Sequence, residues 1–183
     1  MSNPADETMA ADLARLGRRV RYLVLLYVAV VVCAAIASTL IWPELLASQP
    51  ALAGLPLAPS RLGIAGRLAA LTALVIDGAP IIWAAHHALR LCQLMAQRRL
   101  FTAQVPRHLQ RMGLALVLTA ALQPVGGALL SMSVGYFGAG THHIAFAFST
   151  DHVGVAVIGA ILIAIAAAAR EAIRIADENA RFI

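Results

Sequence analysis

The sequence contains no lysine, and only 13% of its residues are charged. Soluble domains carry about 25% charged residues. A chain of 183 residues has too little interior to bury a composition that is 61% hydrophobic. The scarcity of charge therefore excludes an ordinary soluble fold. All 14 basic residues are arginine, and with 9 acidic residues they give a formal net charge of +5.

Cysteine is also scarce, and its two positions, Cys33 and Cys92, form no paired metal-binding motif. The chain has no phosphate-binding glycine loop, no nucleophile triad and no paired carboxylates at one membrane depth. An enzyme is accordingly the weaker class, and the sequence identifies no cofactor. Because the arginines lie at the ends of apolar runs, they indicate membrane orientation, and no nucleic-acid partner is expected.

Four hydrophobic runs are each long enough to cross a bilayer, which takes about 20 residues. They predict an all-α membrane protein, a single four-transmembrane-helix bundle with helices near 22–42, 66–91, 112–134 and 151–181. Residues 1–14 are polar and predict a mobile tail or the fraying start of a helix.

The loop between the third and fourth helices has a pattern of its own. Residues 143–149 alternate apolar and small side chains, which predicts a short extracytoplasmic strand or hairpin. Thr150 is expected to cap the fourth helix, with Asp151 in its first turn.

Arginine is distributed unevenly between the two sides of this bundle. The N-terminal tail, the connection between the second and third helices and the C-terminal extension contain Arg15, Arg18, Arg19, Arg21, Arg90, Arg98, Arg99, Arg107, Arg111, Arg170, Arg174 and Arg181. The opposite side contains Arg61 and Arg67. By the positive-inside rule, both termini and the middle connection are expected in the cytoplasm.

Four arginines of the middle connection predict a basic cytoplasmic surface. They are Arg98, Arg99, Arg107 and Arg111. Such a surface would contact anionic lipid headgroups or an acidic partner. The alternative is that these residues only control topology.

Two stretches carry a family resemblance. The segment ALRLCQLMAQRRLFTAQVPRHLQRMG has an arginine-bearing turn with Phe101 and Thr102, then a basic helix ending in Gly113. It resembles the signature of the domain-of-unknown-function 2975 family of bacterial integral membrane proteins. The C-terminal run ILIAIAAAAREAIRIADENARFI is similar to the last helix of that family. The resemblance implies a four-helix protein of the bacterial inner membrane and implies no activity.

Asp77 is an acidic residue near the predicted middle of the second helix. An ionised carboxylate there costs roughly 2.5–3.5 kcal/mol, so Asp77 is expected to be protonated or hydrogen-bonded and to face the bundle interior. Gln123 and Thr119 on the third helix lie at a similar depth and are its expected partners. The simpler interpretation is an interhelical hydrogen bond, and the alternative is an intramembrane site for a proton or a substrate.

The histidines fall into two groups. His86, His87 and His108 lie near the cytoplasmic side, whereas His142, His143 and His152 lie on the other side beside Asp151. Imidazole and carboxylate groups are zinc or copper ligands, so this second group is a candidate metal site. Solvated loop histidines are the alternative, because the spacing is not diagnostic.

Small residues recur along two of the helices. They are Ala29, Cys33 and Ala37 on the first helix, and Ala156, Ala160, Ala164 and Ala168 on the fourth. Such stripes allow tight helix contact within one bundle or between the protomers of a homo-oligomer.

Three functions follow as hypotheses. The first is a bacterial inner-membrane protein of binding, regulatory or accessory type, with lipids or a membrane or cytoplasmic protein as partners. The second is a small oligomeric transporter or channel with a polar path at Asp77 and Gln123. The third is a metal or redox membrane protein that uses the extracytoplasmic histidines.

Overall fold

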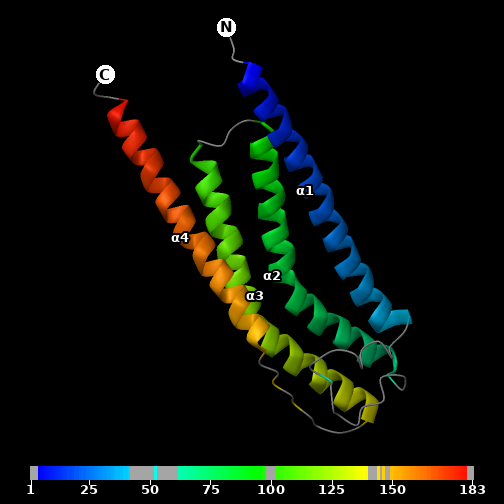
Figure 1. Ribbon diagram of the computed structural model, residues 1–183. Coiled ribbons are helices and arrows are strands. Elements are labelled where there is room, and N and C mark those ends of the chain that lie inside the picture. Colours follow the sequence, from blue (N-terminus) through cyan, green and yellow to red (C-terminus); the bar gives the residue numbers. More distant parts are fainter. Residues whose placement is uncertain are drawn as a thin grey trace. The chain divides into compact units, whose positions relative to one another are not determined.

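The computed structural model describes residues 4–41, 52, 62–97, 102–139, 144, 146 and 149–180. These residues form four long helices and no strand (Figure 1). The helices are α1 (Pro4–Ile36), α2 (Ile64–Ala96), α3 (Gln104–Val134) and α4 (Thr150–Asn179). Two π-helical turns, η1 (Ala37–Ile41) and η5 (Gly135–Ala139), follow α1 and α3.

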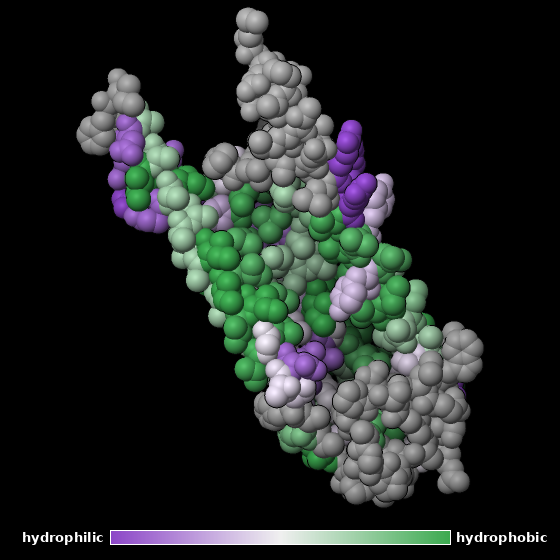
Figure 2. Space-filling model, viewed as in Figure 1, coloured by the Kyte–Doolittle hydropathy of each residue, from purple (hydrophilic) through white to green (hydrophobic). Residues whose placement is uncertain are grey.

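All four helices are long and apolar enough to cross a membrane. A helix of 33 residues, such as α2, is about 50 Å long at about 1.5 Å per residue, whereas a hydrocarbon core is about 30 Å thick. Hydrophobic residues make up much of the described surface on the face shown in Figure 2. The chain therefore has the architecture of a multi-pass membrane protein.

The helices extend beyond the predicted apolar runs. α1 begins at Pro4, so the prediction of a mobile tail is wrong for residues 4–14, and the alternative of a helix start is correct. α3 begins at Gln104 instead of near 112. Pro106 is compatible with this start, because in the first turn of a helix its missing N–H costs no hydrogen bond. Apolar length measures the membrane-embedded part of a helix and not its ends.

The hairpin and the cap predicted before α4 are not observed. Ile144 and Phe146 have no regular secondary structure, and the rest of segment 143–148 lies outside the described residues. The hydroxyl of Ser149 accepts a hydrogen bond from the backbone N–H of Asp151 at 3.1 Å. Ser149 is therefore the N-cap, because Thr150 already belongs to the helix and a cap must precede it.

The chain divides into two compact units, and each contains part of all four helices. Unit 1 comprises Met1–Val28, Ile82–Val117 and Val157–Ile183; unit 2 comprises Ala29–Ile81 and Leu118–Ala156. Each helix thus contributes one segment to each unit.

Unit 2 contains a small apolar core formed by α2, α3 and residues that precede α2. Its buried members are Leu52, Leu62, Ala70, Ala73, Leu130 and Val134. The close approach of α2 to the turn η5 depends on Gly66, since a Cβ atom on this residue would lie 2.6 Å from the Cβ atom of Phe137. Arg67 adds two hydrogen bonds to this unit. Its Nη1 atom donates to the carbonyl of Leu40 at 2.8 Å, and its Nε atom donates to the carbonyl of Leu62 at 3.2 Å.

Unit 1 is packed through glycines. A Cβ atom on Gly113 of α3 would lie 2.6 Å from the carbonyl oxygen of Gly159 on α4, and one on Gly159 would lie 2.7 Å from the carbonyl oxygen of Gly113. Gly17 of α1 packs in the same manner against the carbonyl oxygen of Cys92 on α2, at 3.1 Å. Small residues thus bring pairs of helix backbones into direct contact.

The small-residue stripes on α1 and α4 do not form these contacts. Ala160, Ala164 and Ala168 are exposed, while the buried residues of α4 are Gly159 and Ala166. Three of the four stripe residues on α4 therefore do not pack within the bundle, which leaves contact between protomers as the prediction for them. Spacing alone identified a small-residue face but not the face that packs.

Candidate functional site

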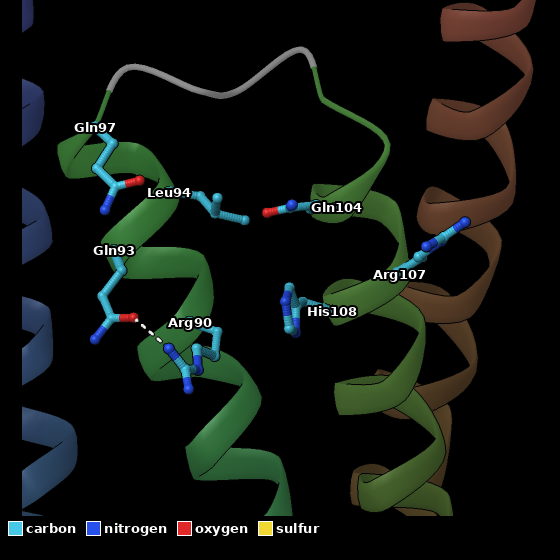
Figure 3. A pocket seen from close by; sticks show the side chains of 7 residues that line it. All are labelled: Arg90, Gln93, Leu94, Gln97, Gln104, Arg107 and His108. Carbon is cyan, nitrogen blue, oxygen red and sulfur yellow. Dashed lines mark hydrogen bonds between the residues drawn. The ribbon is translucent and has the colours of Figure 1, made fainter.

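A polar cavity of about 480 Å³ lies in unit 1 between the end of α2 and the start of α3. It is lined by Arg90, Gln93, Leu94, Gln97, Gln104, Arg107 and His108. In Figure 3, Leu94, Gln104 and His108 project between the two helices, whereas Arg107 extends from α3 away from α2. The Nη1 atom of Arg90 donates a hydrogen bond to Oε1 of Gln93 at 3.2 Å.

The charged groups that line this cavity are arginines, and no acid is among its lining residues. Glutamine side chains supply amide donors, and guanidinium groups bind phosphate and carboxylate oxygens with charge-assisted hydrogen bonds. The arrangement is therefore suited to an anion. Its volume falls in the range of about 300–1,000 Å³ that small-molecule sites occupy.

A histidine pair lies beside this cavity and contributes His108 to its lining. The Nδ1 atoms of His87 and His108 are 3.1 Å apart, so one imidazole donates a hydrogen bond and the other accepts it. His87 is 4% exposed, and its Nε2 atom is buried without a hydrogen-bond partner. The rings of Trp83 and His86 pack edge-on against His87. This packing holds His87 in place, and through the shared hydrogen bond it orients the ring of His108 that lines the cavity.

Comparisons with protein-family models, curated proteins and solved structures found no match for this chain. Function must be inferred from the chain itself.

Asp77, Gln123 and Thr119 lie within unit 2. Asp77 packs against Gly126 of α3, where a Cβ atom would lie 2.7 Å from the Cβ atom of Asp77 and 3.0 Å from its Oδ1. Gln123 is one helical turn from Gly126, and Thr119 is 2% exposed. The Oδ1 atom of Asp77 and the Oε1 atom of Gln123 are both buried without a hydrogen-bond partner. The structure thus places Asp77 against α3, and its predicted hydrogen bond to Gln123 or Thr119 stays a prediction.

The candidate metal site is only partly described. His142 and His143 lie outside the described residues, while Asp151 and His152 lie in the first turn of α4. Nδ1 of His152 accepts a hydrogen bond from the backbone N–H of Ser149 at 3.4 Å. Among the residues that the structure describes, no three His, Cys, Asp or Glu side chains gather to hold a metal ion.

The predicted basic surface is described in part as well. Arg98 and Arg99 lie outside the described residues, whereas Arg107 and Arg111 are exposed on α3. Arg107 belongs to the polar cavity, so that part of the prediction lies at the site.

The sequence interpretation missed the pairing of His87 with His108, although a signal existed. The short connection between α2 and α3 joins antiparallel neighbours and so brings the histidines near it to the same end of the two helices, although His87 lies nine residues before the end of α2 and His108 only four after the start of α3. Counting outward from that connection also brings Arg90 and Gln93 opposite the first turns of α3.

Proposed function

We propose that this chain is a small binding protein of the bacterial inner membrane that holds an anionic lipid headgroup in its polar cavity. The observation that supports the proposal is the lining of that cavity, in which the charged side chains are arginines and amides supply further donors. A regulatory or accessory role would follow from such binding.

The position of the cavity along the helices favours a lipid as the source of the anion. The cavity lies at the end of α2 and the start of α3, which are both apolar helices of spanning length. Both helices are longer than the hydrocarbon core is thick, so their ends reach the depth of the headgroups. A phosphate group at that depth would meet Arg90 without leaving the membrane surface.

The distribution of arginine supports a cytoplasmic position. Nine described arginines belong to unit 1: Arg15, Arg18, Arg19, Arg21, Arg90, Arg107, Arg111, Arg170 and Arg174. Among the described residues of unit 2, Arg67 is the only one. By the positive-inside rule, unit 1 then contains the cytoplasmic ends of the helices, with both termini in the cytoplasm. The resemblance to the domain-of-unknown-function 2975 family supports the bacterial inner membrane.

Lipid retention measured by native mass spectrometry tests the proposal. The full chain in mild detergent is titrated with phosphatidylglycerol or with zwitterionic phosphatidylcholine. We expect retention of phosphatidylglycerol and a loss of more than about tenfold in its apparent affinity in an Arg90→Gln, Arg107→Gln variant, since each hydrogen bond to a charged group contributes about 1.5–3 kcal/mol and about 1.4 kcal/mol is tenfold.

The matched control is an Arg18→Gln, Arg19→Gln variant. It removes the same charge from exposed positions of unit 1 that do not line the cavity. It should bind phosphatidylglycerol as the unmodified chain does. Equal retention of the two lipids, or an equal loss in both variants, would refute a specific site and leave only a general attraction to negative charge.

A further inference from the structure

Two buried acceptor oxygens in unit 2 have no donor. They are Oδ1 of Asp77 on α2 and Oε1 of Gln123 on α3. Burial of a polar atom without a partner destabilises the fold, and more so when the atom carries charge. Since an ionised carboxylate and an amide oxygen can only accept, neither atom can satisfy the other.

The surrounding backbone adds acceptors in place of donors. Pro80 on α2 and Pro124 on α3 are both buried inside their helices. Because proline has no N–H, each leaves the carbonyl four residues earlier without its helical partner, at Ile76 and Ala120.

Gly126 brings the carboxylate close to α3. A Cβ atom at this position would lie 3.0 Å from Oδ1 of Asp77, so any larger residue would push that oxygen away. Gln123 lies one turn away on the same helix. Two packed helices of spanning length thus each carry a buried, unpartnered oxygen within one helical turn of the Asp77–Gly126 contact.

Positive charge is scarce around these oxygens. Among the described residues of unit 2, Arg67 already donates to the carbonyls of Leu40 and Leu62. His152 of α4 belongs to the same unit, and its Nδ1 atom accepts a hydrogen bond from the backbone of Ser149. Asp151 adds a further negative group at the start of α4, where it is exposed.

We propose that Asp77 and Gln123 form an intramembrane site for a small monovalent cation, either a proton or Na⁺. A proton on Oδ1 of Asp77 would turn the carboxyl into a donor for Oε1 of Gln123. Na⁺ would instead be coordinated by both oxygens, which are the ligand type that hard cations prefer. The site lies in unit 2 and does not depend on the anion cavity of unit 1.

Infrared spectroscopy and carbodiimide labelling of the full chain in liposomes test this proposal. The carbonyl stretch of a protonated carboxylic acid should appear in the unmodified chain and be lost in Asp77→Asn. Dicyclohexylcarbodiimide, which reacts with protonated carboxyl groups in apolar surroundings, should label Asp77, as located by mass spectrometry. Labelling is followed against pH in NaCl and in choline chloride of equal concentration.

The two cations give different results. If the site takes Na⁺, NaCl should slow labelling severalfold relative to choline chloride at one pH; if it takes only a proton, labelling should depend on pH and be equal in both salts. In either case Gln123→Leu should shift the pH of half-maximal labelling, whereas Thr72→Val, a change on the exposed side of α2, should not.

Two results would overturn the proposal. One is the absence of any Asp77-dependent acid band together with identical spectra in the two salts, because the carboxylate would then persist without a cation. The other is an unchanged labelling profile in both Gln123→Leu and Gly126→Ala, each shown by gel filtration to be folded, because the site would then not involve α3.

Discussion

Alanine at Gly113 should destabilise the packing of α3 against α4 in unit 1. Its Cβ atom would lie 2.6 Å from the carbonyl oxygen of Gly159 and 2.8 Å from Cγ1 of Ile163, whereas ordinary contact begins at 3.4 Å. Relief of the backbone contact alone requires 3.4 − 2.6 = 0.8 Å of movement. Because the opposing atom belongs to the backbone, no side-chain rotation can remove the clash. Overpacking of this kind costs about 1–3 kcal/mol.

Equilibrium unfolding in mixed micelles, with SDS as the denaturant and circular dichroism as the signal, measures this cost. The control is Gly154→Ala on α4, since a Cβ atom there meets nothing within 4 Å. This control should be neutral or slightly stabilising, because alanine favours a helix by about 1 kcal/mol over glycine. If the two variants unfold at the same SDS fraction, the glycine contact does not determine the α3–α4 distance.

A double variant sharpens the test. Once Gly113→Ala has separated the helices, Gly159→Ala meets less resistance, so the cost of both together should be smaller than the sum of the single costs. A non-additivity of about 0.5 kcal/mol or more is expected for residues in direct contact. Strict additivity would show that each alanine is accommodated independently.

Three further predictions follow from the fold. Arg67→Gln should lower the free energy of unfolding by on the order of 1 kcal/mol, as measured in the same SDS titration, since two carbonyls lose their donor; an unchanged midpoint would refute that role. In a cysteine-free background, Gln97→Cys should react with a membrane-impermeant maleimide only after cell lysis and Gly63→Cys in intact cells, and the reverse pattern would contradict the proposed orientation. Replacing His87 or His108 alone with leucine should cost more than replacing both, because a single change leaves a buried imidazole nitrogen unpaired, and a coupling energy of zero in this double-mutant cycle would show that the pair is not formed.

Helix type and number could be predicted from composition, and some packing faces could be as well. The spacing of Ala70, Ala73 and Ala84 puts them on the same helix face as Asp77, and all three are buried. The pairing of Arg174 with Glu178 on α4 also follows from their spacing of four. These features depend on the positions of residues within a single helix, and helical periodicity assigns those positions directly from the sequence.

Features that depend on two helices could not be predicted in the same manner. Ala160 and Gly159 are adjacent, but only Gly159 packs, because its partner Gly113 comes from a helix whose rotation the sequence does not specify. The partners of His87 likewise depend on the register between α2 and α3.

The sequence by itself determined that this chain has four helices able to cross a membrane, since bilayer thickness sets the apolar length and few charges interrupt the runs. It also placed Asp77 within the apolar part of the second of them. Only the tertiary structure decided which polar groups meet: Arg90 beside Gln104 and His108 around a cavity, and Asp77 against Gly126. The physical reason is that helix rotation and register are selected by side-chain packing between helices, and apolar side chains facing lipid constrain neither.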